Sequence, residues 1–155
     1  MANMRPFDVP SMKFATAFFT IGDRRYAMLH AKNFEANVSI DTPTFGVLGR
    51  MFKAAKPNGA ELKCKITVYK VSEMFDKVIE EYKNTGIMPT FEVQVSNDDP
   101  ATNIGRSEKV YHDCVITGDV LLSAFDVDGE FIEQEIEFYA MDYSSNGKYT
   151  DPDYM

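Results

Sequence analysis

The sequence predicts a mainly β fold of the α+β class, a small antiparallel β-barrel or sandwich with one flanking helix. Apolar and polar residues alternate with period two in several separate segments, whereas only one segment carries a helical stripe. No apolar run approaches the ~20 residues that cross a bilayer. The chain of 155 residues fits one domain with a real core. We therefore expect a single domain, residues 1–155, without stable membrane anchoring.

The first half of the chain predicts four strands behind an N-terminal arm at residues 1–12. Residues 13–20 and 24–32 are β-rich and flank an IGDR turn, which is typical of a hairpin. Residues 33–41 and 60–71 alternate strictly, so each is expected to be a strand with one wet face. The inward residues would be Phe34, Ala36, Val38 and Ile40 in the first, and Leu62, Cys64, Ile66 and Val68 in the second.

One helix is expected at about residues 72–85. Ser72 is a suitable N-cap, and Gly86 is a natural residue for the C-terminal end. The apolar residues between them follow a helical spacing and form one stripe, consisting of Met74, Phe75, Val78, Ile79 and Tyr82. This helix is expected to cover the core.

The second half returns to strands at residues 90–96, 109–117, 119–125 and 131–143. A polar loop, 97–108, separates the first two, and DVDGE at 126–130 predicts a turn. The final strand would carry Glu133, Glu135 and Glu137 on one face, a possible acidic surface. The tail, 144–155, shows no packing pattern and is expected to be exposed.

Composition limits the classes of function. The net charge of -8 argues against a tightly held nucleic acid, because phosphate binding needs clustered Lys and Arg. Residues 1–71 carry 11 Lys/Arg against 5 Asp/Glu, a net of +6, and residues 72–155 carry 5 against 19, a net of -14. Such an asymmetry suits a subunit whose one face recognises a different face of its neighbour. The N-terminus lacks a secretory apolar core, and two cysteines without a CxxC pair predict reduced thiols.

No motif predicts catalysis, a metal or a cofactor. In the YHDC stretch at 111–114, strand geometry would place His112 and Cys114 on one face and Asp113 on the other. Asp113 could then not orient His112 as a triad requires. The DVDGE turn lacks the glycine that a calcium loop needs at its sixth position. The glycines at 42–59 match neither the Walker phosphate-binding pattern nor the GxGxxG pattern. We therefore predict that the protein is not an enzyme.

The segment TPTFGVLGRMFKAAKPNG, residues 42–59, is the unusual feature. A loop of this length in a compact domain is uncommon and usually functional or disordered, and its apolar content argues against disorder. Exposed on a monomer, it would be an aggregation liability, whereas a surface buried against a partner would suit it. We expect inter-subunit contacts here from Phe45, Val47, Leu48, Arg50, Met51, Phe52, Lys53 and Lys56.

Three phrases around these elements carry a family resemblance: YKV at 69–71, GIMPTF at 86–91 and YAMDY at 139–143. With the order strand, long loop, strand, helix, strand, they make the chain similar to the tail tube proteins of contractile-tailed phages and phage-tail-like bacteriocins. The resemblance covers approximately residues 30–145. The stretch 97–108 and the C-terminal tail look individual to this protein.

The resemblance implies a structural subunit, with rings of six stacked into a hollow tube inside a sheath. That tube would be driven through a target envelope and conduct DNA or ions. The implied partners are other copies, a sheath protein, a baseplate initiator and a tape measure protein, with DNA only as passing cargo. Assembly would take place in the bacterial host cytoplasm, and the subunit would belong to the particle after lysis. The alternative from the residues is a ligand-binding β-barrel with loop 42–59 as a lid. An enzyme using His112 is the weakest of the three.

Overall fold

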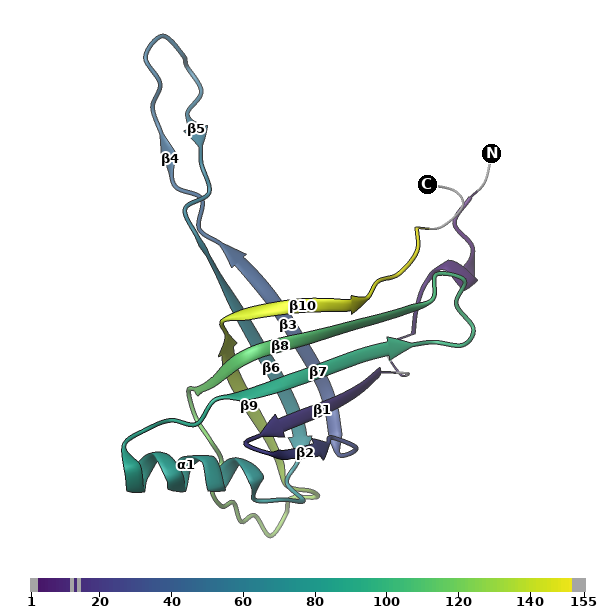
Figure 1. Ribbon diagram of the computed structural model, residues 1–155, viewed down its shortest axis with the longest axis vertical. Coiled ribbons are helices and arrows are strands. Elements are labelled where there is room, and N and C mark those ends of the chain that lie inside the picture. Colours follow the sequence, from purple (N-terminus) through teal and green to yellow (C-terminus); the bar gives the residue numbers. More distant parts are fainter. Residues whose placement is uncertain (1–2, 12, 14, 152–155) are drawn as a thin grey trace.

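The computed structural model describes residues 3–11, 13 and 15–151, and antiparallel strands are its main regular structure (Figure 1). A short 3-10 turn, Pro6–Asp8, precedes them. The strands are β1 (Ala15–Ile21), β2 (Arg24–Ala27), β3 (Ala31–Ile40), β4 (Thr44–Phe45), β5 (Ala54–Ala55), β6 (Ala60–Tyr69), β7 (Phe91–Asp98), β8 (Arg106–Thr117), β9 (Glu133–Ala140) and β10 (Asp142–Gly147). One helix, α1 (Met74–Thr85), lies between β6 and β7. The predicted mainly β class with one helix is confirmed.

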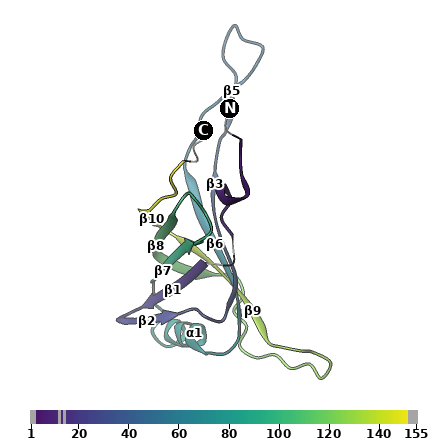
Figure 2. The ribbon, with the colours of Figure 1, turned by 90° about the vertical axis from the view of Figure 1, so that its right-hand side faces the viewer.

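One sheet runs in the order β2-β1-β7-β8-β9-β6-β3, with β10 added beside β8. The long strand β8 joins its two halves, because Arg106–Cys114 pairs with β7 and Val115–Thr117 pairs with β9. The two halves cross at a steep angle, so the sheet folds over itself in the manner of an open barrel or sandwich (Figures 1 and 2). The hairpin predicted around IGDR is present as β1 and β2.

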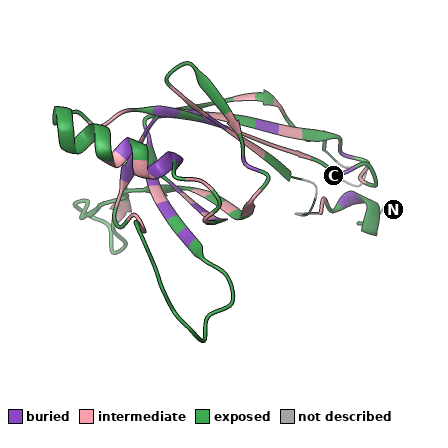
Figure 3. Cartoon of the chain, turned by 90° about the horizontal axis from the view of Figure 1, so that it is seen from below, coloured by how far each residue is buried: buried purple, intermediate pink, exposed green. Residues whose placement is uncertain are grey.

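The core fills the space between the folded sheet and α1 (Figure 3). At its centre Phe19 contacts three other rings, those of Phe75 on α1, Phe91 on β7 and Phe138 on β9, at centroid distances of 5.6, 5.6 and 6.0 Å. Each ring comes from a different element, so this cluster connects both halves of the sheet to the helix. The inward row predicted for residues 60–71 is confirmed, since Cys64, Ile66 and Val68 are completely buried.

The helix starts later than the sequence predicted. Its N-cap is Glu73, and the Ser72 hydroxyl accepts a hydrogen bond from the Met74 amide at 3.3 Å instead of capping the first turn. The reason is local, because the hydroxyl closes a tight turn before the helix begins. The C-terminal end is as predicted: Gly86 adopts a left-handed conformation with φ +76° and donates its N–H to the Tyr82 carbonyl. No helix in the described part of the chain is long and apolar enough to span a membrane.

Two predictions for the second half are wrong in part. Residues 119–125 form no strand and belong to a long loop between β8 and β9. The predicted last strand, 131–143, divides into β9 and β10, and β10 turns back to pair with β8 through residue 147. The tail is therefore hydrogen bonded over 144–147 although largely exposed, and Thr150 donates its N–H to the Ile104 carbonyl at 2.7 Å. Residues 152–155 lie outside the described residues.

The described residues of the N-terminal arm lie against the turn that follows β7. The Phe7 carbonyl accepts hydrogen bonds from the Asn103 amide and the Thr102 hydroxyl, both at 2.9 Å. Asp99, buried in that turn, accepts the amide hydrogens of Ser11 and Ala101. The polar loop predicted at 97–108 is shorter than expected, because β7 and β8 extend into it from both sides.

Candidate assembly surfaces

The segment 42–59 is a β-hairpin that extends β3 and β6 away from the body of the protein (Figure 1). Strand β4 pairs with β5, and the Asn58 amide donates to the Asp41 carbonyl at 2.7 Å. A turn closes its tip, where the Arg50 amide donates to the Val47 carbonyl and Gly49 has φ +84°. The sequence predicted a loop without strands here; the structure has an ordered ribbon, hereafter the 42–59 hairpin.

The hairpin exposes large apolar side chains. The fractional exposure is 103% for Leu48, 91% for Met51 and 84% for Phe52, whereas Phe45 and Val47 nearer its base are half-exposed. Its basic residues Arg50, Lys53 and Lys56 are exposed too, and none of them forms an ion pair with a described residue. The eight residues named from the sequence thus lie together on one projection, and no described residue outside the hairpin covers its apolar tip.

The row Glu133, Glu135 and Glu137 lies on the outer face of β9, but it is not a row of free charge. Each carboxylate faces a lysine, from the adjacent strand β6 in the pairs Lys65–Glu135 at 3.0 Å and Lys63–Glu137 at 4.0 Å, and from β3 on the far side of β6 in the pair Lys32–Glu133 at 3.0 Å. The hydrogen bond to Glu135 raises the pKa of Lys65, so that lysine stays charged. This face is a cross-strand ladder of alternating charge.

A second exposed apolar segment escaped the sequence reasoning. The loop that joins β8 to β9, residues 118–132 and hereafter the acidic loop, projects from the other end of the protein (Figure 2). It contains Asp119, Asp126, Asp128 and Glu130 and no Lys or Arg. Phe125, Val127 and Phe131 are 92%, 83% and 79% exposed. The signal was present in the sequence as four acidic residues among apolar ones, although the predicted strand at 119–125 obscured it.

The acidic loop is tied to the body beside a largely buried ion pair. The Lys70 ammonium, at the end of β6, donates to both carboxylate oxygens of Asp76 on α1, at 3.1 and 3.2 Å. The same ammonium donates to the Leu121 carbonyl at 2.8 Å. An open hollow of about 610 Å³ lies beside this junction, and a second of about 270 Å³ lies between residues 124 and 133. The acidic loop is therefore flanked by two concave surfaces.

The YHDC stretch differs from its predicted geometry. β8 contains a bulge, in which Phe91 pairs with Cys114 but Val93 pairs with Tyr111, and Asp113 has φ +51°. The extra residue reverses the alternation, so Tyr111 and Cys114 face the core while His112 faces outward. The prediction that His112 and Cys114 share a face is wrong for this reason. The His112 ring contacts Glu92 at 3.3 Å and Ser144 at 2.9 Å, joining three strands.

A family model described as phage tail tube protein matches residues 2–145. The chain belongs to this family of phage tail tube proteins. Members of the family are structural tube proteins and not enzymes. This tail tube protein is 31% identical over 124 residues to the phage-like element PBSX protein XkdM of Bacillus subtilis (strain 168), a match that covers 80% of this chain and 84% of the relative. It is also 31% identical over 116 residues to the uncharacterized protein YqbM of the same organism, covering 75% of this chain and 78% of YqbM.

Solved structures share the fold of this tail tube protein. The tube-terminating cap of the anti-feeding prophage superposes with a TM-score of 0.67 at 13% identity, over 96% of this chain and 95% of that one. The SPP1 tail tube superposes with a TM-score of 0.61 at 14% identity, over 92% of this chain and 81% of that one. A third match is a chain of the sheath-tube complex of an extracellular contractile injection system in the extended state. It superposes with a TM-score of 0.57 at 12% identity, over 94% of this chain and 93% of that one. At these identities the likeness concerns the fold.

Proposed function

We propose that this protein is the repeating subunit of the inner tube of a contractile phage tail or phage-tail-like particle. Six copies form a ring, and rings stack into a hollow tube that a sheath drives through the target envelope. The proposal rests on one observation: in this member of the tail tube family, the 42–59 hairpin exposes apolar side chains that no other described part of the chain covers. Burying such residues against a second copy removes apolar surface from water, which drives association.

The partners follow from the same role. Other copies supply the ring and the tube, a sheath protein surrounds it, and a baseplate initiator and a tape measure protein set its start and length. DNA, or in a headless particle ions, passes through the channel as cargo. Subunits assemble in the bacterial host cytoplasm and leave as part of the particle at lysis. The charge ladder of Glu133, Glu135 and Glu137 is our candidate for the lumen surface, since its balanced charges hold phosphates weakly.

The alternative, a ligand-binding barrel with a lid, is not favoured by the placement of the hairpin. The hairpin extends away from the body along the long axis of the molecule (Figure 1). The two hollows at the acidic loop lie at the opposite end, so the hairpin covers neither of them.

Electron microscopy of the purified protein tests the proposal. In negative stain, concentrated protein mixed with its baseplate initiator is expected to show rings and tubes with a central channel. A deletion of residues 44–56 is expected to leave a folded domain that forms neither. The matched triple variant Leu48→Ser/Met51→Ser/Phe52→Ser keeps the length of the hairpin but removes the apolar side chains of its tip. It is also expected to fold and to form neither rings nor tubes. A wild-type protein that stays monomeric at high concentration beside the initiator would refute the tube role.

A further inference from the structure

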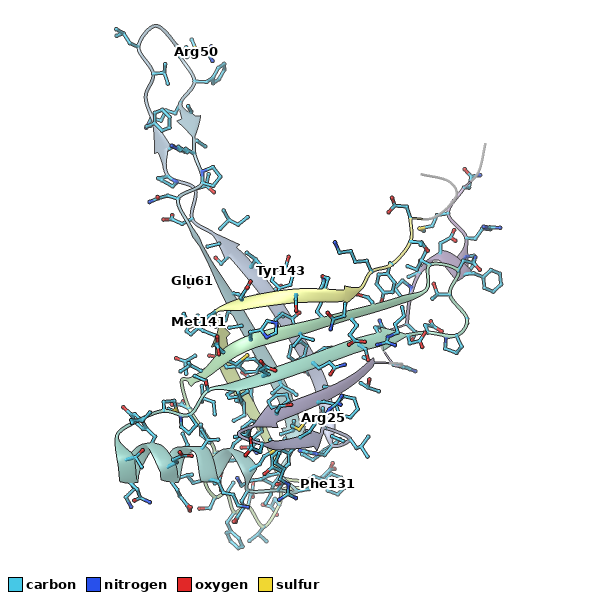
Figure 4. All side chains as sticks on the ribbon, viewed as in Figure 1. Arg25, Arg50, Glu61, Phe131, Met141 and Tyr143 are labelled. Carbon is cyan, nitrogen blue, oxygen red and sulfur yellow. The ribbon has the colours of Figure 1, made fainter. Side chains whose placement is uncertain are left out.

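The two exposed apolar segments lie at opposite ends of the molecule. Figure 4 shows Arg50 at the tip of the 42–59 hairpin and Phe131, in the acidic loop, at the far end of the long axis. The hairpin tip therefore cannot reach the acidic loop of its own chain. Copies stacked along this axis would bring the hairpin of one toward the acidic loop of the next.

The two segments are opposite in charge. The 42–59 hairpin has Arg50, Lys53 and Lys56 and no acidic residue, whereas the acidic loop has four carboxylates and no basic residue. None of these seven groups forms an ion pair with a described residue. Charges of opposite sign on two surfaces of one chain suit a contact between two copies and fix its orientation.

The two segments also complement each other in shape. The hairpin tip is a narrow convex projection that carries Leu48, Met51 and Phe52 almost fully exposed. The acidic loop lies between two hollows, the larger lined by residues that include Val71, Leu122 and Ile132 and the smaller by residues that include Phe125 and Phe131. Buried side chains of a tight interface sit in such depressions, with charges at the rim.

We propose that the tip of the 42–59 hairpin of one copy binds the acidic loop, 118–132, of a second copy further along the tube. Leu48 and Phe52 enter the hollows, and Arg50 and Lys53 face Asp126 and Asp128. The contact joins two different surfaces of the chain. A pair of copies therefore still has one unoccupied hairpin tip and one unoccupied acidic loop, so further copies can add and the assembly extends without closing. This inference rests on the proposed tube function and assigns the partner surface of its contact.

Charge reversal in two separate proteins tests the pairing. The tip variant is Arg50→Glu/Lys53→Glu, and the loop variant is Asp126→Lys/Asp128→Lys. Each alone is expected to raise the concentration needed for tube formation by about tenfold or more. An equimolar mixture is expected to assemble near the wild-type concentration, because each reversed surface then meets an opposite one. Glu80→Lys/Glu81→Lys on α1 changes the charge as the loop variant does, and it is expected to assemble normally.

Disulfide trapping tests the same contact independently. Leu48→Cys/Phe131→Cys places one thiol on each surface, while the native Cys64 and Cys114 are buried and do not interfere. Diamide, which takes up the two electrons and two protons of each thiol pair, is expected to convert tubes of this variant into a ladder of covalent oligomers. Each single cysteine variant, and Leu48→Cys/Leu29→Cys, is expected to give no ladder beyond the dimer.

The two ideas fail in different ways. The wild-type protein can form tubes while the two charge-reversed proteins fail to assemble in a mixture, or while the double cysteine variant gives no ladder. Either result overturns the assigned pairing and leaves the tube function standing. A wild-type chain that forms no tubes with the initiator overturns the function itself.

Discussion

The largely buried ion pair of Lys70 and Asp76 gives a quantitative test of how the fold is held together. The ammonium and carboxylate lie 3.1 Å apart, with side-chain exposures of 10% and 13%, and the ammonium also donates to the Leu121 carbonyl. Lys70→Met leaves the Asp76 carboxylate buried without a counter-charge and removes the donor from that carbonyl. Breaking a buried pair in this way costs about 3–5 kcal/mol, and we take about 3 kcal/mol because both side chains retain some exposure.

The surface pair of Lys65 and Glu135 is the matched control. Its atoms are 3.0 Å apart, but its side chains are 44% and 49% exposed. Solvent screens this pair, so Lys65→Met should cost much less stability than Lys70→Met. Thermal unfolding, measured at concentrations where the chain is monomeric, should show that the melting temperature falls by about 6–12 °C for Lys70→Met and clearly less for Lys65→Met.

A double variant separates charge from packing. In Lys70→Met/Asp76→Leu no charge is left buried alone, so most of the stability lost by Lys70→Met should return. Equal losses of stability in Lys70→Met and Lys65→Met would refute the reasoning that burial sets the strength of these ion pairs. A double variant less stable than Lys70→Met alone would refute it as well.

Two further predictions concern buried thiols and one glycine. Burial raises the pKa of Cys64 and Cys114 to about 12 from 9.0. The thiols of the unfolded chain therefore lose their protons at lower pH than those of the folded chain. The stability that the buried thiols contribute should be full below pH 9 and fall as pH rises from 9 toward 12. In thermal melts, the Cys64→Ala/Cys114→Ala variant should show a flatter dependence of stability on pH. Gly86→Ala should cost about 1 kcal/mol in urea unfolding because φ is +76° there. Gly46→Ala, at a position without positive φ or nearby atoms, should be neutral, and equal costs for the two would contradict the argument.

The strands that alternate cleanly could be predicted from the sequence where one face meets the core. On β3 this holds only for the first part of the predicted inward row, because Phe34 and Ala36 pack against the core whereas Val38 and Ile40 are exposed, so the prediction for these two is wrong. β6 is the clearest case: Cys64, Ile66 and Val68 are buried and their neighbours Lys63 and Lys65 form surface ion pairs. The bulge at Asp113 could not be predicted in this way. One extra residue in a strand leaves no recognisable signal in the sequence pattern, yet it turns His112 to the face opposite Cys114.

The candidate surfaces were accessible from the sequence only in part. The 42–59 hairpin was noticed because its apolar and basic residues fit neither a core nor a solvated loop. The acidic loop was missed because VLLSAF at 120–125 resembles a buried strand, and only the tertiary fold leaves it without a partner strand. Likewise the pairing of Glu133, Glu135 and Glu137 with lysines depends on the register of β3, β6 and β9.

The continuity of the 42–59 hairpin with β3 and β6 has a mechanical consequence. Both strands are ten residues long, and β6 lies between β3 and β9 in the sheet. A pull on the hairpin along its own direction therefore acts parallel to these strands. The hydrogen bonds of the β3–β6 and β6–β9 ladders are then loaded together in shear rather than opened one after another from an end. Force applied at the tip is transmitted directly into the Phe138 side of the core, so the projection and the body resist axial tension as one element.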